Sequence, residues 1–303
     1  MTCEDRDLKH LQGLSLEEKV QKTKERIIEW YTCFDGKVYI SFSGGKDSTV
    51  LLDIARKLYP DIEGVFADTG LEFPEIRDFV KTFDNVAWIR PKIPFNQVIK
   101  KYGWPIISKE QSQFISQYRN AKSEKTKDTR WNGNKWGRGK ISEKWKYLLD
   151  APFKISDQCC DVMKKKPFKL FEKTTGKKAI IGTMANESQL RLQKYNRDGC
   201  NAFDAKRQIS APLSFWLEKD IWEYINKNNV KYCSIYDKGA ERTGCSFCLY
   251  GYHRDIERGF KPNIIRLKEL HPKLYDYCMN KLGMKEVLEW YPKKKDLDIL
   301  EIL

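Results

Sequence analysis

A glycine-rich turn is the first stretch of the chain whose residue types could do chemistry. It consists of Ser43-Gly44-Gly45-Lys46-Asp47-Ser48. Backbone N–H groups in such a turn converge on one point, and the helix N-terminus that follows adds partial positive charge, so the turn can bind an anion. The serine hydroxyls and the Lys46 ammonium add donors for phosphate. Asp47 stands where the Walker A pattern needs Ser or Thr, which excludes the phosphate loop of kinases and GTPases. A solvated β–α turn is the alternative.

Four of the nine cysteines form two close pairs. Cys159 and Cys160 are adjacent, and two residues separate Cys245 from Cys248. A CxxC presents two sulfurs to one metal, and a second pair completes a set of four thiolates. Zinc usually binds spaced pairs, so adjacent cysteines suit it poorly. The spacing indicates a metal or cluster site, with reduced structural cysteines or a redox pair as alternatives. The other five are Cys3, Cys33, Cys200, Cys233 and Cys278. They are expected to be small buried residues, and Cys200 and Cys233 are the best candidates among them for a sulfur-relay role.

The apolar pattern predicts the elements that must position these residues. Strands are expected at 38–42, 64–67, 86–89 and 179–182, and helices at 15–33, 49–58 and 74–83. Buried strands that alternate with helices predict an α/β fold with a Rossmann-like parallel sheet and helices on both faces. Asp68 and Thr69 follow the second strand, at the sheet edge where ligands bind. Asp68 could hold Mg²⁺ or a ribose hydroxyl there, or cap a turn.

Positive charge is concentrated in two stretches of the chain. The net charge is +14, from 56 Lys and Arg against 42 Asp and Glu, and residues 121–148 and 164–178 each carry a net +6. The first stretch also holds Trp131, Trp136 and Trp145. Lysines with interleaved aromatic rings suit nucleic acid through phosphate contacts and base stacking. An exposed insertion without a fixed partner explains that stretch equally well.

The glycine turn resembles the SGGKDS signature of the pyrophosphate-loop ATPases at every position from Ser43 to Ser48. The run Asp68-Thr69-Gly70-Leu71-Glu72-Phe73-Pro74-Glu75 is similar to the phosphoadenosine phosphosulfate (PAPS) reductase branch of that fold, and Gly182 to Arg191 resembles its Gly…Glu-Ser-x-x-Arg segment. A cysteine pair followed by CxxC is the 4Fe-4S pattern of adenylylsulfate (APS) reductases and of the ATPase subunit of DNA phosphorothioation systems. The resemblance covers about residues 35–285 and loses register within 110–150.

The resemblance implies an adenine nucleotide alpha-hydrolase-like fold, with ATP and Mg²⁺ bound at the turn and a 4Fe-4S cluster. The cluster ligands would be Cys159, Cys160, Cys245 and Cys248. The nucleotide site would comprise Ser41, Ser43, Gly44, Gly45, Lys46, Asp47, Ser48, Asp68, Thr69 and Gly182. The catalytic candidates are Lys46, Asp47, Asp68, Glu187 and Arg191. A plain i, i+4 ion pair is the alternative for the last two.

The function expected from these features is a PAPS reductase-family iron–sulfur ATP pyrophosphatase that adenylates an acceptor and supports sulfur transfer. The family's reductases end in a Glu-Cys-Gly-Leu-His segment that this sequence lacks, and their loop tends to lack the lysine. A PAPS or APS reductase-type oxidoreductase is the first alternative, and a non-catalytic nucleotide-binding regulator is the second. The expected partners are an adenine nucleotide, a tRNA or DNA acceptor on stretches 121–148 and 164–178, and a sulfur-donor protein.

Composition adds the setting and the domain plan. Hydrophobic residues make up 41% of the chain, enough for a buried core. No apolar run is long enough to span a membrane, and the start Met1-Thr2-Cys3-Glu4-Asp5 lacks an apolar signal core, so a cytoplasmic protein is expected. The expected parts are an N-terminal helix at 1–36, the nucleotide-binding α/β domain at 37–230 with a basic insertion at about 121–148, and a cluster-completing, Cys-rich helical region at 231–303.

Overall fold

The computed structural model describes residues 8–290, which form two compact units. Unit 1 comprises 8–68, 74–90 and 167–243, and unit 2 comprises 69–73, 91–166 and 244–290. Each unit is assembled from several chain segments, whereas the divisions expected at residues 36 and 230 each cut the chain once. Cys3 and the tail beyond residue 290, both included in the sequence-based expectations, lie outside the described residues.

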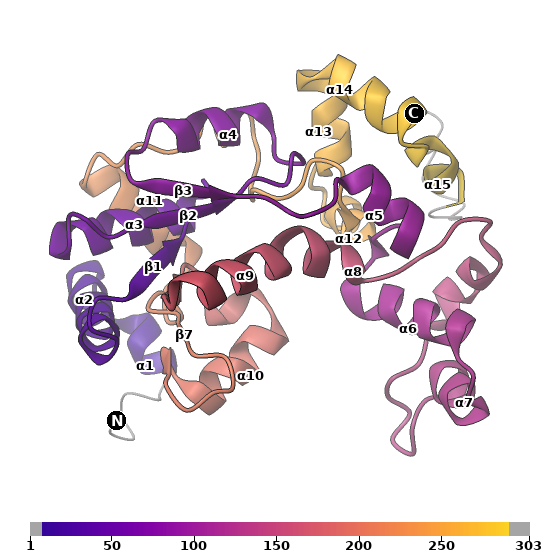
Figure 1. Cartoon of the computed structure of the whole chain (residues 1–303), viewed down its shortest axis with the longest axis horizontal. Helices are drawn as coiled ribbons and strands as arrows, with labels where there is room; N and C mark the ends of the chain where they lie inside the picture. Colours follow the sequence, from indigo (N-terminus) through magenta and orange to yellow (C-terminus); the bar gives the residue numbers. More distant parts are fainter. Residues whose placement is uncertain (1–7, 291–303) are drawn as a thin grey trace. The chain divides into compact units, whose positions relative to one another are not determined.

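Unit 1 is built on a sheet that, in the described part of the chain, has six strands in the order β3-β2-β1-β5-β7-β6. Figure 1 labels β1, β2, β3 and β7 of this sheet. Every neighbouring pair is parallel except β6 and β7. The predicted α/β class is therefore confirmed. The strands are β1 (Val38–Ser41), β2 (Gly64–Ala67), β3 (Val86–Ile89), β5 (Lys178–Ile181), β6 (Asn201–Ala202) and β7 (Ile209–Ser210).

Helices cover both faces of this sheet. Phe168 and Phe171 of α9 pack on one face, against Tyr39 and neighbouring strand residues. Because side chains alternate along a strand, Val38 and Ile40 point to the opposite face, where they are also buried. The helices of unit 1 are α1 (Leu8–Gly13), α2 (Leu16–Cys33), α3 (Lys46–Leu58), α4 (Pro74–Lys81), α9 (Lys166–Thr175), η4 (Ala185–Glu187), α10 (Gln189–Asp198) and α11 (Glu218–Lys227).

The strand order fixes where unit 1 can bind a ligand. β1 lies between β2 and β5, so the sheet continues through β2 and β3 on one side of β1 and through β5 and β7 on the other. In open parallel sheets, ligands bind outside the carboxyl ends of the strands at such a switch point. The loop after β1 is the glycine turn, and the loop after β5 begins at Gly182. The two loops singled out in the sequence therefore lie side by side at the same edge of the sheet.

Unit 2 is mainly helical, with one short parallel pair formed by β4 (Ile106–Ile107) and β8 (Leu249–Tyr250). Two segments of this unit contain a wider π-helical turn, and one of these turns directly follows Cys160. The helices are α5 (Phe95–Tyr102), α6 (Lys109–Asn120), α7 (Glu124–Asn132), η2 (Glu143–Asp150), α8 (Gln158–Cys160), η3 (Asp161–Lys165), α12 (Tyr252–Glu257), α13 (Asn263–Leu270), α14 (Pro272–Asp276), η5 (Tyr277–Lys281) and α15 (Met284–Trp290).

The N-terminal helix α2 is part of unit 1. It begins with the expected capping box, in which the Glu18 backbone N–H donates to Ser15 Oγ at 3.3 Å and the Ser15 N–H donates to Glu18 Oε2 at 2.9 Å. On its inner face, Lys19 Nζ lies 2.7 Å from Asp220 Oδ2 of α11, and both side chains are almost fully buried. Asp220 also accepts the backbone N–H of Leu217 and so caps α11.

Replacing Lys19 with methionine should lower the free energy of unfolding by about 3–5 kcal/mol, because Asp220 would remain buried without its counter-charge. Urea denaturation followed by circular dichroism would measure the change. Lys24→Met, on the same helix but without a buried partner, is the control and should change stability by less than about 0.5 kcal/mol. Equal stability of the two variants would contradict a structural role for the buried pair.

None of the helices within residues 8–290 combines the length and the apolar character that crossing a membrane requires.

Candidate functional site

The glycine turn joins β1 to α3 and can be made only with glycine at two positions. Gly44 has a φ of +72°, and a Cβ there would lie 2.8 Å from Val80 Cγ2. A Cβ on Gly45 would lie 2.5 Å from Thr243 Oγ1. Ser41, the last residue of β1, is half-buried and pairs in register with Val65 and Ile181. Backbone therefore lines the turn, as an anion cradle requires.

Hydroxyl groups hold this turn in shape. Ser48 Oγ accepts the backbone N–H of Ser43 at 3.1 Å and donates to the carbonyl of Gly45 at 2.9 Å. The hydroxyls of Ser43 and Ser48 are 3.1 Å apart, and Ser43 is exposed while Ser48 is buried. Ser48 thus stabilises the loop, whereas Ser43 presents its side chain at the surface of the cradle.

Lys46 is buried and surrounded by groups that favour its charge. Its Nζ lies 3.1 Å from Glu218 Oε1, donates to the carbonyl of Glu241 at 3.0 Å, and sits 5.3 Å from the ring centre of Tyr236. Burial alone would lower the pKa of Lys46, but the neighbouring charges of Asp47, Tyr236 and Glu218 raise it overall. Lys46 is therefore positively charged at neutral pH, and a phosphate could take the place of the Glu218 carboxylate as its ion-pair partner.

One carboxylate oxygen of Asp47, Oδ1, is buried and accepts no hydrogen bond from the residues that the structure describes. Burial raises the pKa of this carboxyl, against the opposing charge of Lys46. A Cβ on Gly182, in the loop after β5, would lie 3.0 Å from the Asp47 carbonyl oxygen, so the two loops touch at this point. An unsatisfied carboxylate oxygen is a donor that suits Mg²⁺, so the residues present fit this ion.

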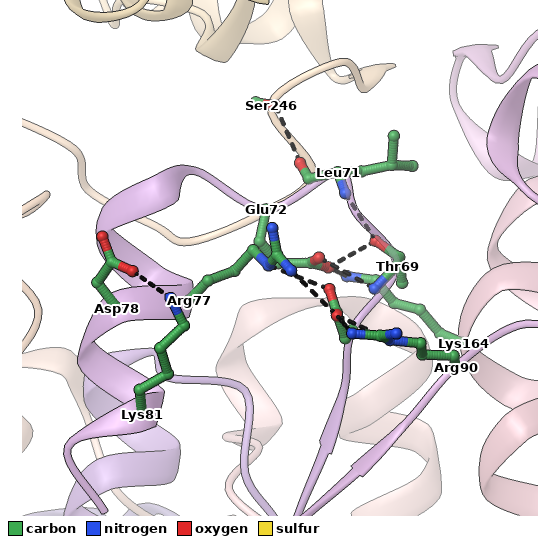
Figure 2. Close-up of polar contacts among 10 residues, drawn as sticks. Thr69, Leu71, Glu72, Arg77, Asp78, Lys81, Arg90, Lys164 and Ser246 are labelled. Atoms are coloured by element: carbon green, nitrogen blue, oxygen red, sulfur yellow. Dashed lines mark hydrogen bonds and ion pairs between the residues drawn. The ribbon is translucent and has the colours of Figure 1, made fainter.

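Asp68 forms ion pairs with two arginines, Arg77 and Arg90, which Figure 2 labels. Arg77 Nε lies 3.2 Å from Asp68 Oδ1, and Arg90 Nη2 lies 3.1 Å from Asp68 Oδ2. The Asp68 side chain is only 4% exposed, whereas that of Arg90 is 72% exposed. The buried carboxylate thus orients two guanidinium groups at the carboxyl end of β2.

Glu187 and Arg191 meet at the start of α10. They form an ion pair, and Glu187 Oε2 also accepts the backbone N–H of Met184 at 2.7 Å. Arg191 borders a cavity of 270 Å³ within unit 1, which Lys194 and Cys200 also line. Burial lowers the pKa of both Arg191 and Lys194, against the opposing charges of Asp47 and Asp198. Two basic side chains, one of them paired with Glu187, therefore border the cavity.

The four thiols expected as ligands lie together in unit 2. Cys159 is buried, and the other three are half-buried. Burial raises the pKa of Cys159, and the charges of Cys245, Cys160 and Cys248 raise it further. Burial and Cys245 likewise raise the pKa of Cys248, to about 12. The sulfurs are thus close enough to oppose one another's ionisation, which bound metal would relieve.

The segment 69–73, which follows β2 and belongs to unit 2, forms hydrogen bonds with the segment that carries Cys245 and Cys248. Figure 2 shows Leu71, whose carbonyl accepts the backbone N–H of Ser246 at 2.7 Å and its hydroxyl at 2.9 Å. Glu72 accepts the hydroxyl of Thr69 at 2.7 Å and lies 3.8 Å from Lys164 Nζ. Lys164 in turn donates a hydrogen bond to Cys245, whose charge is the largest cause of the raised pKa of Lys164.

A single metal ion and an iron–sulfur cluster place different demands on the four cysteines. Within residues 8–290, no three His, Cys, Asp or Glu side chains are arranged so that they could hold a single metal ion. A cluster makes a different demand, because each iron takes one thiolate and the four thiolates need not converge on one point. Four mutually interacting thiols beside one lysine fit a Cys₄-ligated cluster in their chemistry.

Several residues of the site have no signal in the sequence. Glu218, Tyr236 and Thr243 surround Lys46 and Gly45, yet they lie far along the chain from the glycine turn. Thr69, which is expected at the nucleotide site, donates a hydrogen bond to Glu72 in unit 2. Only the spacing of Thr69 and Glu72, three residues apart, gave a local signal of this contact.

Comparisons with known proteins agree with these motifs. Residues 37–250 match the phosphoadenosine phosphosulfate reductase domain. An uncharacterized protein of Methanocaldococcus jannaschii is 28% identical over 86% of this chain and 52% of its own length, so the chain spans about half of that relative. The adenosine 5′-phosphosulfate reductase of Geobacillus kaustophilus is 26% identical over 73% of this chain and 77% of the reductase.

Two solved structures show weaker likeness. The PAPS reductase of Candida auris, solved as a phosphate complex, is 18% identical with a TM-score of 0.45, over 81% of this chain and 96% of that one. The U34-tRNA thiolase of Methanococcus maripaludis, solved with its [4Fe-4S] cluster, is 12% identical with a TM-score of 0.40, over 89% of this chain and 80% of that one.

Proposed function

Because the chain belongs to the phosphoadenosine phosphosulfate reductase domain family, we propose that it is an iron–sulfur ATP pyrophosphatase, which adenylates an acceptor and supports sulfur transfer to it. The observation that carries the proposal is the complete glycine turn, with buried Lys46 and the unsatisfied oxygen of Asp47 beside it. A reductase whose substrate is already activated does not bind ATP for adenylation and so does not need the glycine turn, Lys46 and Asp47 for that step.

The residues of unit 1 divide the adenylation step among them. Backbone N–H groups of the turn and Lys46 would bind the β- and γ-phosphates of ATP, and Asp47 would ligate Mg²⁺. An acceptor oxygen would attack the α-phosphorus and lose its proton, the bond to the β-phosphate oxygen would break, and pyrophosphate would leave. Asp68 would keep Arg77 and Arg90 in place, and the cavity beside Arg191 would take an anionic part of the substrates.

The thiols of unit 2 would provide the sulfur chemistry. Cys159, Cys160, Cys245 and Cys248 would hold a 4Fe-4S cluster, with Lys164 placing positive charge beside Cys245. When bound, such a cluster supplies irons that can hold sulfur and exchange electrons. In the sequence, Cys245 follows Thr243, the residue beside Gly45, by two positions. A sulfur nucleophile would then displace AMP from the adenylated acceptor.

A PAPS or APS reductase-type oxidoreductase is the second candidate. The similarity to the Geobacillus kaustophilus reductase favours it, as does the four-cysteine set. Such an enzyme would cleave the sulfur–oxygen bond of an activated sulfate and would need a thiol reductant as electron donor. It would not need ATP.

Anaerobically purified protein incubated with ATP, Mg²⁺ and candidate acceptors should release pyrophosphate and AMP in equal amounts once sulfur is supplied. Enzyme-coupled detection of pyrophosphate and chromatography of AMP would measure both. A parallel incubation with PAPS or APS and a thiol donor, assayed for sulfite, tests the second candidate. Sulfite formation without pyrophosphate from any acceptor would refute the ATP pyrophosphatase.

A further inference from the structure

A short closed turn in unit 2 presents a tryptophan at its tip. The Asn134 side-chain oxygen accepts the backbone N–H groups of Trp136 and Arg138, each at 3.0 Å, and the Asn134 N–H donates to the Arg138 carbonyl at 2.7 Å. Gly137 adopts a φ of +69° and donates to the Asn134 carbonyl at 2.7 Å. The turn 134–138 therefore has a defined shape without support from an apolar core.

Its base is fixed to the preceding helices by Arg130. Arg130 Nε donates to Gln117 Oε1 at 2.7 Å, Nη1 donates to the Gly139 carbonyl at 2.6 Å, and the guanidinium stacks 4.4 Å from the Phe114 ring centre. The Ile141 N–H donates to the Arg130 carbonyl at 2.8 Å, which closes the loop on α7. The turn is thus displayed from α6 and α7 at a fixed position.

The displayed surface is aromatic and cationic. Trp136 is 69% exposed, more than any other aromatic residue that the structure describes. Lys135 Nζ lies 4.2 Å from the centre of its ring. Lys135, Arg138 and Lys140 are exposed, and none forms an ion pair with an acidic residue that the structure describes. α7 contributes no buried residue to the core. Exposed apolar surface with no core function is typical of a binding site.

The second basic stretch differs from this surface. Lys177 lies 2.8 Å from Glu63, Lys166 lies 3.8 Å from Asp161, and Lys164 contacts Glu72 and Cys245. These three cations are paired within the fold, whereas Lys165, Lys169 and Lys173 are exposed and form no ion pair with an acidic residue that the structure describes. The aromatic rings of this stretch, Phe168 and Phe171, pack against the sheet. Of the two basic stretches, 121–148 is therefore the one that combines exposed cations with an exposed aromatic ring.

We propose that the turn 134–138, with Lys135, Arg138, Lys140 and the Trp136 ring, binds single-stranded nucleic acid. An unpaired base would stack on the free face of Trp136, and the cations would contact the flanking phosphates. A duplex keeps its base faces stacked inside, so its internal bases cannot use the ring. That this strand is the acceptor to be adenylated rests on the proposed function, whereas the binding does not.

Fluorescence anisotropy with labelled 12-nucleotide RNA and DNA strands, and with their duplexes, tests the surface without ATP. Trp136→Ala should weaken single-strand binding by about tenfold, and Trp136→Phe should retain most of it. Arg138→Gln with Lys140→Gln should reduce the slope of log K against log salt by about 1.4, because two phosphate contacts are lost. The matched control is Lys273→Gln with Lys285→Gln, two exposed lysines of unit 2, which should leave the slope unchanged.

Equal affinity of Trp136→Ala and the unaltered chain, or tighter binding of duplex than of single strand, would overturn the proposal. Displacement of the strand by an acidic peptide at equal charge concentration would instead assign the surface to an acidic protein partner and would also overturn it. Failure of strand binding alongside pyrophosphate release to another acceptor would refute this inference alone. Strand binding by a chain that never releases pyrophosphate would refute the proposed function alone.

Discussion

Replacing Lys46 with methionine should lower pyrophosphate release by about 10²–10³-fold, the effect of removing one pre-organised group that stabilises developing charge. Methionine keeps most of the volume of the buried side chain and removes only the ammonium. The Glu218 carboxylate, 3.1 Å from Lys46 Nζ, would then face the cradle without its cation and would repel phosphate. Steady-state pyrophosphate release at saturating and limiting ATP would separate the loss of binding from the loss of turnover.

Lys57→Met is the matched control, because Lys57 lies on the same helix but is half-exposed and pairs with Asp53 at 2.8 Å. Its pyrophosphate release should equal that of the unaltered chain. Asp47→Asn provides a second variant of the same shape, and we expect it to raise the Mg²⁺ concentration needed for turnover. Normal turnover in Lys46→Met, or an equal loss in Lys57→Met, would show that the glycine turn is not an ATP site.

The glycine turn was predictable because its determinants are local. A buried strand, two glycines and a helix that begins at Lys46 follow one another within a few residues, so their order alone places the turn at the sheet edge. The capping box of Ser15 and Glu18 is local in the same sense. The partners of the turn were not predictable, because Glu218 and Thr243 reach it only through the tertiary fold.

The segment that follows β2 has contacts that no sequence pattern indicates. Asp68 and Thr69 are expected at the nucleotide site, and Asp68 lies at the carboxyl end of β2. The residues from Thr69 to Phe73 belong to unit 2, where the Leu71 carbonyl accepts hydrogen bonds from Ser246, which lies between the two cysteines of the CxxC. A hydrogen bond between residues 175 positions apart leaves no periodic or compositional signal.

Replacing Cys245 with alanine should abolish the iron–sulfur cluster. The unaltered chain should carry about four irons and absorb at about 400 nm, and the variant should show neither the iron nor the absorbance. Cys245 interacts with the other thiols and with Lys164. Its loss therefore removes one ligand of the cluster and the hydrogen-bond acceptor of Lys164. Because pyrophosphate release depends on residues of unit 1, it should persist in this variant while sulfur incorporation into the acceptor stops. Iron analysis and the absorbance spectrum of anaerobically purified protein would give the first result, and mass spectrometry of the acceptor the second.

Cys233→Ala is the matched control, since Cys233 is a buried cysteine of unit 1 whose pKa burial raises in the same direction. It should keep the full iron content, because no thiol of the set lies in unit 1. Lost stability could mimic lost ligation, so thermal melting of both variants with and without iron separates the two causes: only a ligand variant should lose the stabilisation that iron confers. A colourless unaltered chain that binds one zinc, or a Cys245→Ala variant with undiminished iron, would contradict the cluster assignment.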